Sequence, residues 1–95
     1  MNVKISAFLN EDGRITQFPT KHSVQLAVLS YLAEKFEPDR SYLEKEVNAI
    51  CDEWHTFHDY FLLRRCLVDA KLLSRKTDGS AYWRTPTENK GGLSL

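Results

Sequence analysis

The sequence predicts a small α+β domain with the winged helix-turn-helix arrangement, in which three helices precede a β-hairpin wing and a further β-hairpin stands at the N-terminus. Two observations predict this fold. Apolar residues recur with the helical period of about 3.6 residues in three segments, and the period changes to about 2 at Leu73. Asp-Gly pairs, which favour tight hairpin turns, occur at residues 12–13 and 78–79.

Length and composition narrow the class further. The chain has 95 residues, of which 42% are apolar and 27% charged, as is typical of one globular domain. We expect an N-terminal β-hairpin extension over residues 1–19, a winged-helix-like domain over 20–85 and a disordered tail over 86–95. The sequence shows neither a membrane-spanning apolar run nor a signal peptide, and its two cysteines fit reduced thiols, so we expect a cytoplasmic protein.

The N-terminal hairpin is predicted from two short apolar runs, residues 6–9 and 14–18, on either side of the first Asp-Gly turn. Pro19 ends the second run. A helix over residues 2–9 is the alternative for the first run.

Each of the three helices has a start signal and an apolar face. The capping residues are Thr20 for a first helix over 21–36, Ser41 with Glu44 as a capping box for a second over 42–54, and Asp59 for a third that runs to Lys71. The residues expected to face inward are Val24, Val28, Leu29, Tyr31, Leu32 and Phe36 on the first helix, Leu43, Val47, Ile50, Cys51 and Trp54 on the second, and Tyr60, Leu63, Cys66, Leu67 and Ala70 on the third.

The wing is predicted directly after the third helix. Its strands cover residues 73–76 and 81–84, joined by the second Asp-Gly turn, and Pro86 ends the returning strand. Because side chains alternate between the two faces of a strand, one of Tyr82 and Trp83 faces the core.

Charge is distributed unevenly along the chain, although the formal net charge is zero. Residues 1–54 carry six basic and nine acidic side chains, whereas residues 55–95 carry seven basic and four acidic ones. The basic excess in the second half can attract phosphate. The alternative is that the two halves neutralise each other within one fold.

Basic residues of the third helix and the wing are the candidate contacts to duplex DNA, because arginine and lysine bind phosphate and arginine reads guanine. These residues are Arg64, Arg65, Lys71, Arg75, Lys76 and Arg84. Two alternatives stay open. Exposed apolar residues on the same elements fit a protein partner, namely Phe61, Val68 and Trp83. The two helical arginines can also pair within the chain, Arg64 with Asp52 or Glu53 and Arg65 with Asp69.

Several pieces of the sequence match one bacterial family. They are Phe8-Leu9…Asp12-Gly13-Arg14, Pro19-x-Lys21, Leu26-Ala27-Val28-Leu29-x-Tyr31-Leu32-Ala33, Glu44-Lys45-Glu46-Val47-Asn48, Trp54-His55-Thr56-Phe57-x-Asp59, Leu63-Arg64-Arg65-x-Leu67-Val68-Asp69 and Asp78-Gly79-Ser80-x-Tyr82-Trp83-Arg84. On these residues the chain resembles the uncharacterised bacterial domain family numbered two thousand and eighty-seven. The resemblance implies a domain found alone or attached to helix-turn-helix transcriptional regulators. Lys71 departs from the pattern, because such sequences often place glycine after the third helix.

Neither catalysis nor a cofactor is expected. The sequence has no glycine-rich phosphate loop and no nucleophile elbow. Four residues raise the question of zinc, but no Cys-x-x-Cys pair is present; they are Cys51, His55, His58 and Cys66. We therefore predict a module that is not an enzyme and holds no metal.

The N-terminal hairpin offers apolar residues to a second copy of the chain. Phe8, Ile15 and Phe18 lie on its predicted strands, and an apolar edge strand favours pairing. We predict a weak homodimer on this basis. The alternative is that the hairpin packs on the first helix and buries these residues.

Overall fold

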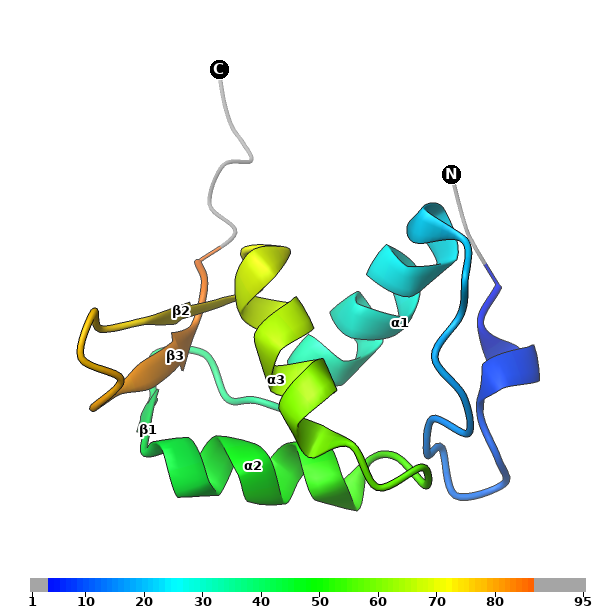
Figure 1. Ribbon diagram of the computed structural model, residues 1–95, viewed down its shortest axis with the longest axis horizontal. Coiled ribbons are helices and arrows are strands. Elements are labelled where there is room, and N and C mark those ends of the chain that lie inside the picture. Colours follow the sequence, from blue (N-terminus) through cyan, green and yellow to red (C-terminus); the bar gives the residue numbers. More distant parts are fainter. Residues whose placement is uncertain (1–3, 87–95) are drawn as a thin grey trace.

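In the computed structural model, residues 4–86 are described, and they form three helices and a three-stranded antiparallel sheet (Figure 1). The α+β class predicted from the sequence is therefore confirmed. In chain order the elements are the 3-10 helix η1 (Ser6–Phe8), α1 (His22–Ala33), β1 (Ser41–Tyr42), α2 (Glu44–Glu53), α3 (Tyr60–Asp69), β2 (Leu73–Arg75) and β3 (Tyr82–Arg84). The tail expected over 86–95 lies, from residue 87 onward, outside the described residues.

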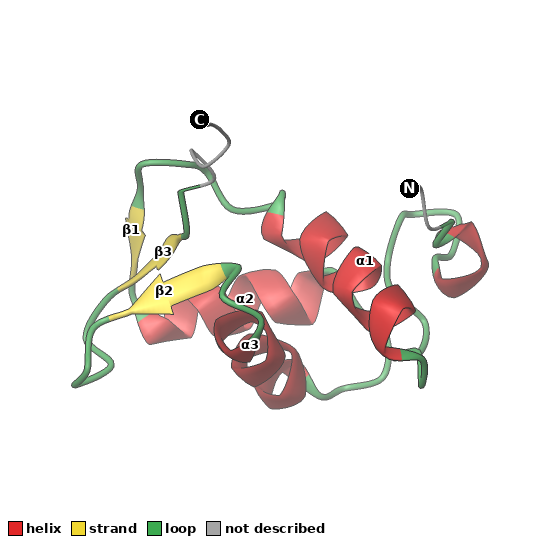
Figure 2. Cartoon of the chain, turned by 90° about the horizontal axis from the view of Figure 1, so that it is seen from above, coloured by secondary structure: helices red, strands yellow, loops and turns green. Residues whose placement is uncertain are grey.

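Helix α3 occupies the centre of the fold and contacts both other helices. The sheet lies on one side of α3, whereas α1 and the N-terminal segment lie on the other (Figures 1 and 2). Helix α2 runs across one end of α3 (Figure 1). No helix among residues 4–86 is long and apolar enough to cross a membrane.

Strand β1 is the element that the sequence analysis missed. It pairs with β3, so the strand order is β1-β3-β2, with Ser41 opposite Trp83. The predicted capping box at Ser41 is therefore wrong, because Ser41 belongs to this strand and α2 begins three residues later. Leu43 occupies the N-cap position of α2, and the side chain of Glu46 accepts a hydrogen bond of 2.8 Å from its backbone N–H.

The core is assembled from all three helices, the sheet and the N-terminal segment. Its buried apolar residues are Ile15, Val28, Leu29, Leu32, Ala33, Phe36, Tyr42, Val47, Cys51, Leu63, Leu67, Leu73 and Tyr82. Two residues expected to face inward are instead exposed, Leu43 at 51% and Tyr60 at 41%. Both lie at helix N-termini, where the apolar stripe of the helix has not yet reached the core.

The N-terminal segment forms the predicted turn but not the predicted strands. Asn10 and Gly13 close the turn with a backbone hydrogen bond of 3.0 Å, and Gly13 has a φ of 78°. A single antiparallel bridge joins Leu9 to Ile15, and the residues before it form η1. Ile15 also bridges to His55 and is fully buried, so it is not available to a second copy of the chain. Phe8 and Phe18 are partly buried against the same core.

Helix boundaries follow the local signals in part. Asp59 caps α3 as predicted, because its Oδ1 accepts a hydrogen bond of 3.1 Å from the N–H of Leu62. Thr20 does not cap α1, which starts after Lys21 without a side-chain cap. At the end of α3, Lys71 adopts the left-handed conformation with a φ of 64°, which glycine commonly adopts where a helix ends.

Candidate functional site

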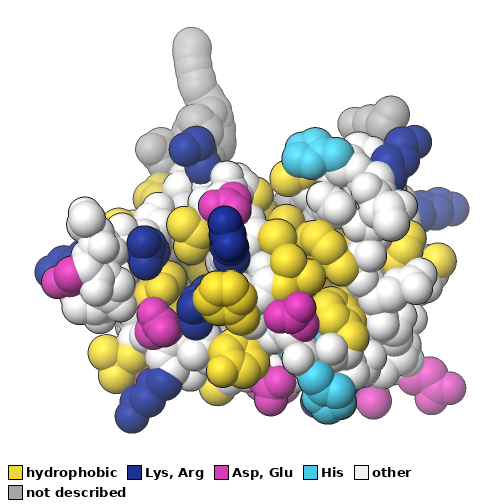
Figure 3. All heavy atoms as spheres, viewed as in Figure 1, with side chains coloured by type: hydrophobic (Ala, Val, Ile, Leu, Met, Phe, Trp, Pro, Cys, Tyr) yellow, Lys and Arg dark blue, Asp and Glu magenta, His cyan; other side chains and the backbone are white. Residues whose placement is uncertain are grey.

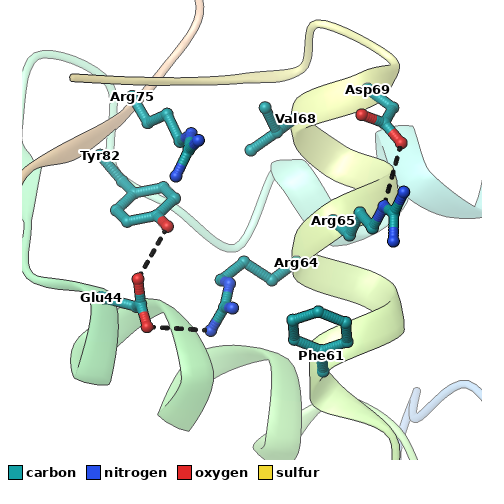
Figure 4. Close-up of a pocket in the computed structure, with 8 residues that line it drawn as sticks. All are labelled: Glu44, Phe61, Arg64, Arg65, Val68, Asp69, Arg75 and Tyr82. Atoms are coloured by element: carbon teal, nitrogen blue, oxygen red, sulfur yellow. Dashed lines mark hydrogen bonds and ion pairs between the residues drawn. The ribbon is translucent and has the colours of Figure 1, made fainter. Parts of the chain in front are cut away.

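An open groove of about 320 Å³ lies between the start of α2, the outward face of α3 and the β2–β3 hairpin (Figure 4). Both polar and apolar side chains line it. They are Glu44, Phe61, Arg64, Arg65, Val68, Asp69, Arg75 and Tyr82. Five of the predicted contact residues therefore meet here, namely Phe61, Arg64, Arg65, Val68 and Arg75.

Arg64 is held inside the fold. Its Nη1 donates a hydrogen bond to Oδ1 of Asn48 and lies 3.4 Å from Oε2 of Glu44, and the side chain is only 14% exposed. The intramolecular alternative is thus what the structure shows, but with a different partner, because Glu44 takes the place expected for Asp52 or Glu53. A guanidinium engaged in this way joins α2 to α3 and has little freedom to contact a ligand.

Arg65 is the exposed arginine of α3. Its Nε lies 3.9 Å from Oδ2 of Asp69, one turn further along the helix, and both side chains are 70% exposed. An exposed pair of this kind is weak, because water screens both charges. Figure 4 shows the guanidinium of Arg65 in front of α3 and turned toward Asp69, on the side of the helix away from Arg75 and Tyr82.

Arg75 reaches the groove from the hairpin. It lies opposite Tyr82 in the register of β2 and β3, and within residues 4–86 it forms no ion pair and no side-chain hydrogen bond. Gly79 turns the hairpin with a φ of 77°. It lies close to Arg75 and Glu44, because a side-chain Cβ at this position would be 3.7 Å from Nη1 of Arg75 and 3.8 Å from Oε1 of Glu44. The hairpin therefore presents a cation without a protein partner at the mouth of the groove.

The hairpin tip also carries an acidic side chain. Asp78 accepts a hydrogen bond of 2.9 Å from the backbone N–H of Ser80, and its hydrogen bonds with Ser80 lower the pKa of the carboxyl. The wing is therefore not uniformly basic.

The other predicted contact residues lie away from the groove. Arg84 donates a hydrogen bond of 3.2 Å to the backbone carbonyl of Phe36, which places it toward the end of α1. Lys71 and Lys76 are exposed at the α3–β2 corner and at the start of the hairpin turn. Trp83 is half-buried and lies on the opposite face of the strand from the buried Tyr82, so the expected alternation is confirmed.

The sequence analysis did not identify Glu44 and Tyr82 as groove residues. Tyr82 donates a hydrogen bond of 3.0 Å to Oε1 of Glu44, whose other oxygen faces Arg64 (Figure 4). Glu44 carries only a local signal for a helix start, and no feature of the sequence around it points to β3. The contact depends on the packing of the sheet against α2.

The face of the molecule that carries the groove mixes charged and apolar side chains. Figure 3 shows hydrophobic side chains along its centre, with basic and acidic side chains interspersed beside them. Phe61 is 54% exposed, and the guanidinium carbon of Arg64 lies 5.1 Å from the centre of its ring. The face is therefore neither a continuous basic stripe nor a purely apolar patch.

The side chains of Cys51 and His55, at the end of α2, are buried in the core. His55 is buried, its Nδ1 lies 2.6 Å from the carbonyl oxygen of Cys51, and its Nε2 accepts a hydrogen bond of 2.7 Å from the N–H of Asp59. Both ring nitrogens are thus occupied by backbone groups. Burial raises the pKa of the Cys51 thiol to about 12. Among residues 4–86 no three His, Cys, Asp or Glu side chains are grouped to hold a metal.

A second groove, of about 310 Å³, lies between α1 and α3 and is more apolar. Its lining includes Leu26, Leu29 and Cys66. None of the basic residues predicted as contacts lines this groove, which shares Asp69 with the groove between α3 and the hairpin.

Comparison with known protein families shows to which family the chain belongs. Residues 14–84 match the family described as uncharacterised protein conserved in bacteria (DUF2087). The chain belongs to the DUF2087 family. The DUF2087 match covers every helix and strand of the fold except η1, and it includes all residues of the α3–hairpin groove. No curated protein and no solved structure matches this DUF2087 chain.

Proposed function

We propose that this DUF2087 domain is a winged-helix module that binds duplex DNA without catalysing a reaction on it, with α3 in the major groove and the β2–β3 hairpin as the wing. The element order supports the proposal. One helix, a short strand, two helices and a hairpin follow one another, and β1 closes the sheet beside β3. In helix-turn-helix proteins the second helix of the pair enters the major groove, and α3 occupies that position.

The observation that carries the proposal is the pair of exposed cations Arg65 and Arg75. One stands on α3 and the other on the hairpin, and both line the same groove. A recognition helix and a wing would contact DNA from these two elements. Arg64 and Arg84 are excluded as principal contacts, because both are engaged by groups of the protein.

The charge of this surface implies weak binding that responds strongly to salt. Arg65 and Arg75, with Lys71 and Lys76 nearby in the chain, bring about two to four positive charges to the DNA, and each phosphate that they neutralise adds about 0.9 to the slope of log affinity against log salt. We therefore expect binding to random duplex DNA at low salt that is largely lost at physiological salt.

A titration of random duplex DNA at several salt concentrations tests the proposal. Arg75→Gln should weaken binding and reduce the salt slope by about 1. Lys21→Gln is the matched control: Lys21 is an exposed cation at the start of α1, on the far side of α3 from the hairpin, and its replacement should leave both quantities unchanged. The absence of binding at low salt, or equal losses in the two variants, would contradict the proposal.

A protein ligand is the second candidate, and Phe61 is the observation that favours it. A 54% exposed phenyl ring in a groove that is also lined by two carboxylates, Glu44 and Asp69, fits a partner that buries an aromatic anchor better than it fits a phosphate backbone. Trp83 lies on the other face of the sheet and does not belong to this surface. Under this candidate Phe61→Ala abolishes partner binding, whereas Arg75→Gln has a minor effect.

A further inference from the structure

Three residues one helical turn apart form an exposed row on α3. They are Phe61, Arg65 and Asp69, and all three line the groove (Figure 4). Residues four apart lie on the same face of a helix, so this row is the part of α3 that would enter the major groove of DNA most deeply. Arg65 and Asp69 are both 70% exposed and are therefore free to meet base edges.

The geometry of the Arg65–Asp69 pair leaves one edge of the guanidinium open. The ion pair, at 3.9 Å, is made by Nε of Arg65. Within residues 4–86 the two terminal nitrogens, Nη1 and Nη2, make no hydrogen bond and no ion pair. A bidentate contact to guanine needs two N–H donors directed at the O6 and N7 acceptors, and these terminal nitrogens can supply them.

The position of Asp69 is unfavourable for binding DNA unless it serves Arg65. A carboxylate that faces a phosphate backbone weakens every DNA complex through repulsion. In water the same carboxylate, one turn from Arg65, pairs only weakly with the guanidinium. Once DNA displaces water from this face, the pair strengthens, restricts the rotation of the guanidinium and lowers the entropy lost when that group binds a base. Asp69 thus lowers the affinity for every duplex but favours the duplex that Arg65 can read.

We infer that Arg65 reads guanine in the major groove and that Asp69 is the positioning residue that orients its guanidinium, so that the domain prefers G·C over A·T base pairs. This inference rests on the proposed function. Arg64 cannot take the same role, because Asn48 and Glu44 hold its guanidinium. Arg75 stands on the hairpin rather than on the helix, where a phosphate contact is the expected interaction.

Three duplexes of equal length test the inference. One has alternating guanine and cytosine, the second has the same sequence with 7-deazaguanine in place of guanine, and the third has alternating adenine and thymine. Removal of N7 deletes one acceptor of the bidentate contact and leaves the base pairing intact. We expect the wild type to bind the first duplex about tenfold more tightly than either of the others, within the range for one such contact.

Three variants distinguish recognition of guanine from general electrostatic attraction to DNA. Arg65→Ala should remove the preference, whereas Arg75→Ala should weaken binding to all three duplexes by the same factor. Asp69→Asn should bind all three duplexes more tightly, because repulsion is relieved, and yet discriminate among them less. A purely structural role of Asp69 would not produce these opposite changes. Circular dichroism melting confirms that the variants are folded, as expected for exposed positions.

The outcomes are distinguishable. Equal binding of the wild type to all three duplexes, or a preference that survives Arg65→Ala, overturns the inference and leaves the proposed function standing. The absence of binding to any duplex at low salt overturns the proposed function and this inference with it.

Discussion

The hydroxyl of Tyr82 donates a hydrogen bond of 3.0 Å to the carboxylate of Glu44, and this bond joins the sheet to the start of α2. The ring of Tyr82 is buried, whereas the side chain of Glu44 is 47% exposed. The second oxygen of the same carboxylate faces Arg64 on α3. One acidic side chain therefore connects the three elements that shape the groove.

Tyr82→Phe tests the contribution of this bond. The phenyl ring retains the packing of tyrosine, so only the hydrogen bond is lost. We expect the free energy of unfolding to fall by about 1 kcal/mol, the usual contribution of one hydrogen bond of this kind. Urea denaturation measures the change. Ser74→Ala is the comparison on the neighbouring strand: its hydroxyl bonds to Thr85 outside the groove, so it should lower the unfolding free energy to a similar extent but leave the affinity for DNA unaltered.

Arg64→Met tests whether Arg64 acts in folding rather than in binding. Methionine preserves much of the apolar stem but leaves Asn48 and Glu44 without their partner, so we expect a loss of about 1–2 kcal/mol in unfolding free energy. Arg65→Met is the matched comparison, because its exposed pair contributes little to stability. The two variants should show opposite behaviour: the first is less stable but still binds DNA, and the second is as stable as the wild type but binds less DNA.

The sequence predicted most of what local patterns determine, although not the start of α1, and missed what distant pairing determines. The cap at Asp59 and the inward stripe with Val28 and Leu32 depend only on neighbouring residues, and both are confirmed. Strand β1 has two residues and no period of its own, so it exists only because β3 pairs with it. For the same reason, the sequence offered pairing of Arg64 within the chain as an alternative but could not identify Glu44 as its partner.

Lys71→Gly tests the cost of the left-handed corner. A lysine with a φ of 64° is strained by its Cβ, and glycine relieves this strain at the expense of backbone entropy in the unfolded chain. We expect a net gain of about 0.5–1 kcal/mol in unfolding free energy. Lys71→Ala removes the same charge but keeps the Cβ, so it should produce no gain. If both variants were equally stabilised, loss of the lysine charge, and not relief of the backbone, would be the cause.

His55→Ala tests the link between α2 and α3. The imidazole receives the N–H of Asp59 at 2.7 Å and contacts the carbonyl of Cys51 at 2.6 Å, and Phe57 packs edge-on against it at 4.5 Å. Its removal leaves the N–H of Asp59 without its partner and a gap in the core, whereas the carbonyl of Cys51 keeps the N–H of Trp54 at 3.3 Å. We expect a loss of about 2–4 kcal/mol, measured by thermal and urea unfolding. His58→Asn is the control, because His58 is exposed and asparagine accepts its φ of 57°.

Cys51 makes the stability of the fold sensitive to alkali. Burial raises the pKa of its thiol from 9.0 to about 12, while Arg64 opposes the rise and Asp52 adds to it. In the unfolded chain the thiol loses its proton near pH 9, so between about pH 9 and 12 the unfolded state binds fewer protons than the folded one. This thiol therefore stabilises the fold fully below pH 9, and its contribution is lost by about 1.4 kcal/mol per pH unit above that value.

Unfolding free energies at pH 8 and pH 10.5 measure the loss. Cys51→Ala should be less stable at both pH values, because it loses buried volume, but its stability should fall less between them. Lysines and tyrosines titrate in both proteins, so the difference between the two slopes isolates the thiol, and equal slopes would show that Cys51 ionises as readily in the folded state as in the unfolded one.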